Sequence, residues 1–385
     1  LHVAKLPPAV PVLQQALDLD LVSAGFLLSL VQLAGMTLGL FVGLSVDAVG
    51  LRRSMLMGLA LLTIASACGG WATNVPTLML LRALEGFGFL WVVMPAPALI
   101  RRTVDAEHMQ ARMGLWGAYM PSGSALALLM GPLVMAAMSW QVWWWLLSLC
   151  TGLAGVAVWR WVPVVNSTAQ ASPAASSDWL RRLRLTLSSA GPWWISLSFA
   201  VYSGQWLAVI GFLPTIYTDM GLSVALTGVL SASVALANVI GNVLSGRLLQ
   251  RGWPAQRLLH IGFGCMALGA VGAFGDWGDA WPLAMRFVSV VLFSAMGGLI
   301  PGTLFSMSVH LAPDDSTVST TVGYMQQWSA LGQFAGPPLV AWVAAQLDTW
   351  AWTWVVTASM CVIGAWLAGR VAHALRVKVA MTSKR

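Results

Sequence analysis

The chain has 385 residues, of which 58% are hydrophobic and only 9% are charged, and its net charge is +7. Soluble globular domains carry roughly 25% charged residues, so this composition excludes a water-soluble fold and, with it, most cytosolic enzyme classes. The Lys and Arg residues stand between apolar runs rather than along one basic face, which argues against a nucleic-acid partner.

Twelve apolar runs follow one another along the chain, and each is interpreted as a membrane-crossing helix. They lie near residues 1–13, 21–46, 54–72, 76–100, 112–138, 141–162, 191–216, 222–248, 255–274, 281–310, 317–345 and 348–371. The long break after the sixth run is rich in Ser and Ala, which is typical of a linker. The prediction is an all-α membrane protein with twelve transmembrane helices in two pseudo-symmetric bundles. Residues 1–163 form one six-helix bundle, 164–190 a cytoplasmic linker, and 191–385 a second six-helix bundle with a cytoplasmic tail.

The cations fall on alternate connections between these runs, beginning with Arg52 and Arg53 and ending with the tail from Arg370 to Arg385. The positive-inside rule therefore places the linker and the C-terminus in the cytoplasm of a multi-pass protein of the inner (plasma) membrane. Trp residues cluster at the ends of runs, as in Trp143–Trp145, and such clusters are predicted to lie at the membrane–water interface.

The chain repeats itself at an offset of about 205 residues, as expected for parallel halves related by an axis along the membrane normal. Tyr119-Met120 followed by Gly131-Pro132 recurs as Tyr324-Met325 followed by Gly336-Pro337, with the same internal spacing. By this repeat the first helix should begin before Leu1, so its start is predicted to be missing from the sequence.

The segment between the second and third runs resembles the cytoplasmic loop signature of the major facilitator superfamily, G-x-x-x-D-(R/K)-x-G-(R/K)-(R/K). The residues that match are Gly43, Asp47, Gly50, Arg52 and Arg53 in GLSVDAVGLRR, whereas Ala48 and Leu51 depart from the pattern. The glycines allow close helix approach and a tight turn. The second copy, GRLLQRG, has Gln250 at the position of Asp47 and so lacks the acid.

A second motif, RALEGFG from Arg82 to Gly88, resembles the family's fourth-helix pattern R-x-x-x-G-x-G. The segment from Phe212 to Gly228 is similar to the cyanate-permease-type branch, which would favour small anions. The resemblance implies that helices 1, 4, 7 and 10 line a central cavity that opens alternately to the two sides of the membrane.

Few ionisable residues lie inside the apolar runs, where a charge is expensive, and they are candidates for transport. Lys5, Arg82 and Arg286 are predicted to form a cationic site for an anionic substrate. The alternatives are an Arg82–Glu85 pair at i and i+3 and an Arg286 bonded only to backbone carbonyls. Glu85 beside Arg82 is the candidate proton carrier, unless a permanent ion pair prevents it from titrating.

Polar-tipped aromatic and amide residues inside the runs are candidates for the cavity wall, and simple helix packing is the equal alternative. They are Tyr119, Tyr324, Trp116, Gln327, Tyr202 and Gln205. Small residues recur at every fourth position of the eighth run, including Gly241 and Ser245, and predict either a sliding contact between halves or static close packing.

The sequence thus predicts a secondary active transporter that moves a small organic anion by alternating access, coupled to protons. The chain carries no GxxxxGK[ST], HExxH or GxSxG pattern, so we expect neither an ATP-driven protein nor an enzyme, with no cofactor and no metal. The expected partners are the substrate, protons and the bilayer, without nucleic acid, for a monomer. A multidrug efflux antiporter and a non-transporting receptor or scaffold remain open as alternatives.

Overall fold

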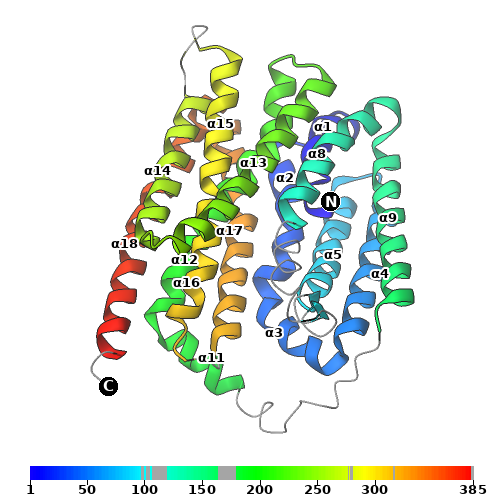
Figure 1. The fold of residues 1–385 in the computed structure, drawn as a ribbon. Helices are drawn as coiled ribbons and strands as arrows, with labels where there is room; N and C mark the ends of the chain where they lie inside the picture. The colour runs from blue at the N-terminus through cyan, green and yellow to red at the C-terminus, as the bar shows by residue number, and fades with distance from the viewer. Residues whose placement is uncertain are drawn as a thin grey trace. The chain divides into compact units, whose positions relative to one another are not determined.

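The computed structural model describes residues 1–96, 99–100, 105, 119–163, 179–275, 277, 281–314 and 317–382, except for the side chains of 43–48 and 379–382. Every regular element among these residues is an α-helix or a 3-10 helix (Figure 1). The elements up to residue 163 are η1 (His2–Ala4), η2 (Pro7–Ala9), α1 (Val10–Leu17), α2 (Leu21–Ser29), η3 (Leu30–Gln32), α3 (Leu33–Val49), α4 (Leu51–Gly69), α5 (Val75–Val93), α8 (Tyr119–Ala137) and α9 (Trp140–Trp161).

The second part of the chain begins with a short helix and continues with long ones. Its elements are α11 (Trp179–Ser188), α12 (Ala190–Asp219), α13 (Val224–Gln250), α14 (Ala255–Phe274), α15 (Leu283–Gly297), α16 (Leu299–Leu311), α17 (Val318–Leu347), η8 (Trp350–Trp352) and α18 (Thr353–Thr382).

Ten stretches of the described chain are long and apolar enough to cross a membrane. Two predicted spans are outside this set for different reasons. The first is broken into η1, η2 and α1, because Pro7 and Pro8 cannot donate backbone hydrogen bonds. The other, α17, has 30 residues but is more polar, with Gln326, Gln327 and Gln333 along its length. With these two, the helices make up the twelve-helix architecture that the sequence predicts.

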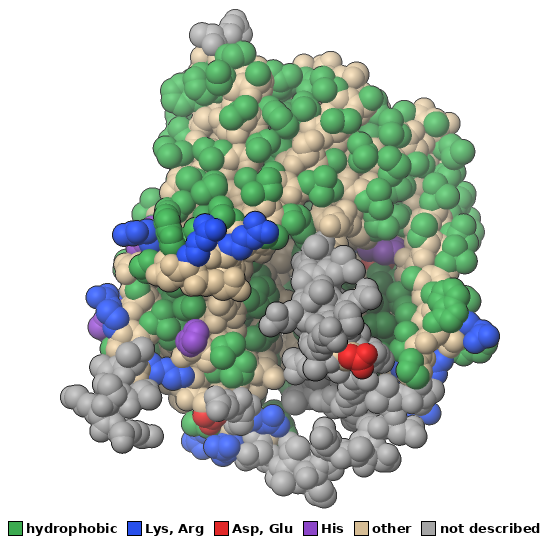
Figure 2. Space-filling model, in the orientation of Figure 1, with side chains coloured by type: hydrophobic (Ala, Val, Ile, Leu, Met, Phe, Trp, Pro, Cys, Tyr) green, Lys and Arg blue, Asp and Glu red, His purple; other side chains and the backbone are tan. Residues whose placement is uncertain are grey.

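Large apolar side chains point outward from these helices, as a lipid environment requires. Leu268 is 69% exposed, Val362 70% and Trp366 58%. In Figure 2, apolar side chains are spread over the upper part of the visible face, whereas Lys and Arg side chains lie from the middle of the view downward. A surface of this kind far exceeds the apolar patches of soluble monomers, so the chain is a multi-pass membrane protein.

The chain divides into two compact units. Unit 1 contains Leu1–Pro173 and Gly211–Ala232, and unit 2 contains Ala174–Ile210 and Ser233–Arg385. In unit 1, α4 packs against α5 and α9, and in unit 2, α14 packs against α15 and α18. Residues 211–232, which the sequence assigns to the second half, therefore pack with unit 1.

The internal repeat is visible in the backbone at the ends of paired helices. Asp18 follows α1 and Gly221 follows α12 near the corresponding position of the second half, and both lie in the left-handed region, at φ 52° and 77°. Gly50 and Gly252 close the two copies of the loop motif at φ 96° and 81°. Glycine suits these positions because it has no Cβ to clash at positive φ.

Glycines let helices of unit 2 approach to backbone contact. A Cβ on Gly204 of α12 would lie 2.6 Å from the carbonyl oxygen of Gly332 in α17. Gly241 of α13 packs in the same way at the end of α15, where a Cβ on Gly241 would lie 2.8 Å from the Cα atom of Gly298. The small-residue face around Gly241 therefore packs closely within unit 2 in this conformation, and whether the contact slides during transport stays a prediction.

Candidate functional site

A buried ionic cluster joins the broken first helix to α5. Lys5 is fully buried and its Nζ donates to a carboxylate oxygen of Glu85 and, over 3.1 Å, to the hydroxyl of Ser66 on α4. The same ammonium group lies 4.6 Å from the ring centroid of Trp144 on α9, a cation–π distance. Lys5 thus contacts three different helices of unit 1.

Arg82 supplies the second cation of the cluster. Its Nη1 donates to the other carboxylate oxygen of Glu85 over 2.8 Å and to the carbonyl oxygen of His2 over 2.6 Å. Its Nη2 donates to the carbonyl oxygen of Val3 over 2.9 Å. Arg82 is 2% exposed and Glu85 1% exposed, so neither charge meets water.

The proline break explains why backbone carbonyls are available to these side chains. In a regular helix the Val3 carbonyl would accept from residue 7, but Pro7 has no N–H. The Lys5 carbonyl would accept from residue 9, but the N–H of Ala9 donates to Leu6 instead. Arg82 occupies the first of these carbonyls, and the indole N–H of Trp143 donates to the second over 3.1 Å.

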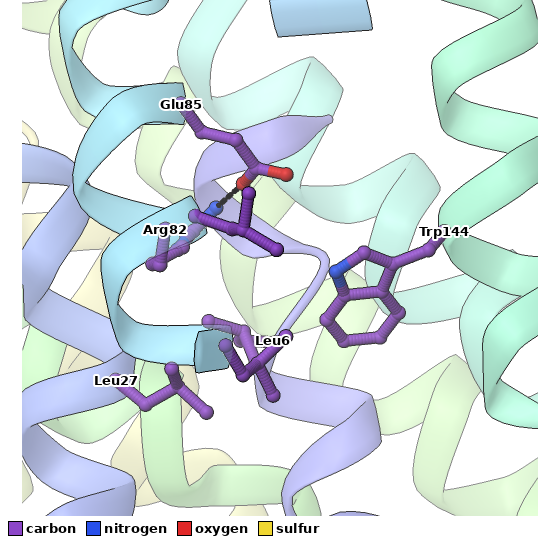
Figure 3. A pocket seen from close by; sticks show the side chains of 7 residues that line it. Leu6, Leu27, Arg82, Glu85 and Trp144 are labelled. Atoms are coloured by element: carbon purple, nitrogen blue, oxygen red, sulfur yellow. Dashed lines mark hydrogen bonds and ion pairs between the residues drawn. The ribbon is translucent and has the colours of Figure 1, made fainter. Parts of the chain in front are cut away.

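A narrow cleft lies beside the cluster (Figure 3). It is lined by Arg82 and Glu85 together with Leu6, Leu27, Leu78, Leu81 and Trp144, and it is too narrow to admit a water molecule. In Figure 3, Arg82 and Glu85 meet on one helix, while Leu6, Leu27 and Trp144 come from other segments around the cleft. The cluster is therefore sealed in this conformation.

Two cations share one carboxylate in this cluster, so its three side chains carry one net positive charge. Both cations have protein partners, which corresponds to the ion-pair alternative that the sequence left open for Arg82 and Glu85. Buried ion pairs are strongly destabilised when one partner is removed. The arrangement thus holds the first helix against α5.

Two tryptophans beside the cluster face the protein interior. Trp143 is 4% exposed and Trp144 1% exposed, whereas Trp145 is 38% exposed, and the position of all three at the membrane–water interface stays a prediction. Trp143 and Trp144 are positioned by contacts with Lys5. Ser66 and Trp144 were not predicted to belong to the site, because no signal in the sequence connects them to Lys5.

Arg286, the third predicted cation, lies in unit 2 near the start of α15. Its Nη1 donates over 3.1 Å to the carbonyl oxygen of Ala273, in the last turn of α14. A cation at a helix C-terminus interacts favourably with the helix dipole. The backbone contact that the sequence gave as the alternative for Arg286 is thus present, and its anion contact stays a prediction.

Tyr202 and Gln205 belong to a buried polar network of unit 2. Asn238 Nδ2 donates to the Tyr202 hydroxyl and to the Ser294 carbonyl, over 2.9 Å each. The Cys361 thiol donates to the Gln205 side-chain oxygen over 3.1 Å. These bonds tie α12 to α13, α15 and α18, so both residues have a packing role in this conformation.

The remaining candidate wall residues are dispersed. Tyr324 is buried and packs edge-to-face against Trp193, with ring centroids 5.2 Å apart, and against Trp328. Tyr119 and Gln327 are half-buried. Trp116 lies outside the described residues.

In the loop signature, the structure describes only the backbone of Gly43 and Asp47. Gly50 precedes α4 at φ 96°, in agreement with the tight turn that its place in the motif predicts. Arg52 donates to the carbonyl oxygen of Trp159, which links the start of α4 to the end of α9, and Arg53 is exposed.

Comparison with known proteins agrees with this architecture. Residues 3–314 and 195–380 match the Major Facilitator Superfamily. In Escherichia coli (strain K12), the cyanate transport protein CynX is 24% identical over 364 residues, which cover 93% of this chain and 89% of the relative. A 2-nitroimidazole transporter of the same organism is 27% identical over 357 residues, covering 89% and 84%.

Among solved structures, a D-xylose-proton symporter has a similar fold, with a TM-score of 0.77 at 14% identity and coverage of 95% of this chain and 93% of that one. This likeness concerns the fold alone. The family match, in contrast, extends over nearly the whole sequence and both halves of the repeat. The chain therefore belongs to the Major Facilitator Superfamily.

Proposed function

We propose that this chain is a secondary active transporter that moves a small organic anion by alternating access, with Glu85 as the proton carrier. The observation that carries the proposal is the cluster of two buried cations on one carboxylate, which leaves one positive charge without a counter-charge among its three side chains. A net charge is expensive inside a membrane, and such charges usually mark a substrate or ion pathway. The relative that transports cyanate, an anion, supports this substrate class.

The cluster supplies a physical reason for coupling an anion to a proton. When the cleft beside Arg82 opens, an entering anion competes with Glu85 for the ammonium group of Lys5 and the guanidinium of Arg82. A proton on Glu85 removes the competing negative charge, so proton binding and anion binding favour each other. Proton and anion then cross in the same direction, and the cluster closes again as an ion pair once both have left.

The proposed orientation places the C-terminus in the cytoplasm. The helix α11 carries Arg181, Arg182 and Arg184, and it lies at the same end of unit 2 as the C-terminal end of α18 (Figure 1). Arginines at one end of a helical unit face the cytoplasm by the positive-inside rule. We propose that the protein acts there as a monomer, without a cofactor.

Substrate counterflow tests the proposal. The purified chain is reconstituted in liposomes that contain unlabelled solute, and uptake of labelled cyanate, small carboxylates, neutral 2-nitroimidazole and a lipophilic cation is compared. We expect counterflow with one or more of the anions and its loss in Lys5→Met, because the substitution removes a cation from the cluster. Export of the lipophilic cation without anion counterflow would contradict the proposal and indicate a multidrug efflux antiporter. Binding of a solute without movement of any would indicate a receptor.

The variant Arg286→Gln tests the second predicted anion contact separately. If Arg286 binds the anion, the affinity for the anion measured by counterflow falls by about tenfold or more in this variant, because a charge-assisted hydrogen bond is lost. Unchanged affinity removes Arg286 from the site and leaves it as a partner of the α14 end.

A further inference from the structure

A second pocket lies in unit 2, and none of the elements that hold the ionic cluster contributes to it. Its volume is about 730 Å³. It is bounded by the end of α13, the turn into α14, the last turns of α16 and the C-terminal part of α18. The turn is the second copy of the loop motif, from Gly246 to Gly252. This copy keeps both glycines, although they are one residue closer together than Gly43 and Gly50, and it changes a residue type between them.

The charge on the pocket wall is positive and comes from Arg376. Arg376 and His310 line the pocket, and none of the described residues that line it is acidic. The first copy of the motif has Asp47 at the position that Gln250 occupies here, and Gln250 is itself a lining residue. The pocket thus holds a guanidinium group without the internal carboxylate that the repeat would lead one to expect.

The start of α14 adds to the positive potential. Pro254 precedes this 20-residue helix without any side-chain cap, and Pro254, Ala255 and Gln256 all line the pocket. The N–H groups of the first residues of a helix have no acceptor within it, and the helix dipole makes this end positive. Phosphate-type oxyanions bind readily to such N-termini.

Apolar side chains form the rest of the wall, among them Leu249, Trp253 and Leu375. Trp253 is 39% exposed, and the guanidinium of Arg257 stacks over it at 5.6 Å. A Trp beside arginines at the end of a membrane helix is typical of the membrane–water interface. The pocket therefore offers a positive end together with an apolar wall at the depth of lipid headgroups.

We propose that this pocket binds an oxyanion of the phosphate class, supplied by the headgroup of an acidic phospholipid, at the position of the missing carboxylate. The anion is held by Arg376, His310 and the start of α14, and the acyl part of the lipid lies along Leu249 and Trp253. A bound headgroup would link α14, α16 and α18, in the role that an acidic residue at position 250 would otherwise have. The fraction of acidic phospholipid in the membrane would then set the stability of unit 2.

The test measures binding to the full chain purified in a zwitterionic detergent. Phosphatidylglycerol, phosphatidylcholine and inorganic phosphate are titrated separately, and bound lipid is counted by native mass spectrometry while the melting temperature is followed. Arg376→Gln and Gln250→Asp are each expected to weaken phosphatidylglycerol binding about tenfold, because one removes a charge-assisted hydrogen bond and the other supplies an internal anion.

Matched controls separate the site from general electrostatics. Arg251→Gln removes the same charge from an exposed residue that does not line the pocket, and Gln250→Asn keeps the amide, so both are expected to bind like the unsubstituted chain. If inorganic phosphate but not phosphatidylglycerol binds, and Arg376→Gln and Gln250→Asp weaken that binding, the pocket is an oxyanion site whose ligand is a soluble anion. Equal binding by all variants, or no binding of either anion by the unsubstituted chain, would overturn the proposal. All substituted side chains are exposed, so folding is preserved.

Discussion

Substitution of Glu85 by Gln tests the ionic cluster most strictly. The change keeps the shape of the side chain and removes the only negative charge among the three side chains, so Lys5 and Arg82 remain buried beside each other. Removing one partner of a buried ion pair typically costs about 3–5 kcal/mol. Lys5 keeps its contacts with Ser66 and Trp144, and Arg82 keeps its hydrogen bonds to two backbone carbonyls. The expected decrease in the free energy of unfolding therefore stays within about 3–5 kcal/mol.

The converse substitution, Lys5→Met, gives the control. It leaves Arg82 and Glu85 as a neutral pair, and the Met side chain replaces the Lys stem over the Trp144 ring. We expect the free energy of unfolding to fall by about 1–2 kcal/mol, because one buried carboxylate oxygen of Glu85 loses its hydrogen-bond donor. Unfolding of both variants by SDS in mixed micelles, followed by Trp fluorescence, measures the difference. Equal losses, or no loss in Glu85→Gln, would show that water or another group compensates the charges.

Three further substitutions and one control substitution test the fold. Gly204→Ala is expected to destabilise unit 2 by about 1–3 kcal/mol, because its Cβ meets an α17 carbonyl, whereas Gly264→Ala, with no atom within 4 Å, should be neutral or slightly stabilising in the same SDS assay. Asp20→Ala removes the cap bond from Ser23 N–H and should lower stability by about 1 kcal/mol. Hydrogen bonds from Ser23 hold the pKa of Asp20 below its ordinary value of 3.8. The destabilisation by Asp20→Ala should therefore be complete above pH 3.8 and disappear as the pH falls through the lowered pKa, and unfolding measured over a pH series checks this. Gly50→Ala places a Cβ at φ 96° and should cost about 1–2 kcal/mol, measured by the same unfolding.

The fold could be predicted because its determinants are local or repeated. Apolar runs of membrane length give the helices, and the duplicated Gly-Pro spacing gives the two halves. The positive φ of Gly50 follows from its place in a tight turn. The break of the first helix at Pro7 and Pro8 is also a local effect of residues that cannot donate hydrogen bonds.

The site could be predicted only in its components. Charges inside apolar runs are few, so Lys5, Arg82 and Glu85 stood out, but the three-way pairing depends on where the proline break places Lys5 in space. Composition cannot show which Trp of a cluster is buried against an ammonium group, so the contact between Trp144 and Lys5 could not be predicted. The Asn238 network of unit 2 was equally inaccessible, because its bonds join residues from three different helices.

The central claim, that the Glu85 carboxylate couples the passage of an anion to that of a proton, is tested most directly by uptake driven by a pH gradient. Labelled cyanate uptake into liposomes containing the chain is measured with an acidic exterior and with no gradient, for the unsubstituted protein and for Glu85→Gln. We predict that the acidic exterior accelerates uptake by the unsubstituted protein and has no effect on Glu85→Gln, which retains gradient-free exchange. Equal stimulation of both proteins, or no stimulation of either while exchange is active, would contradict the claim.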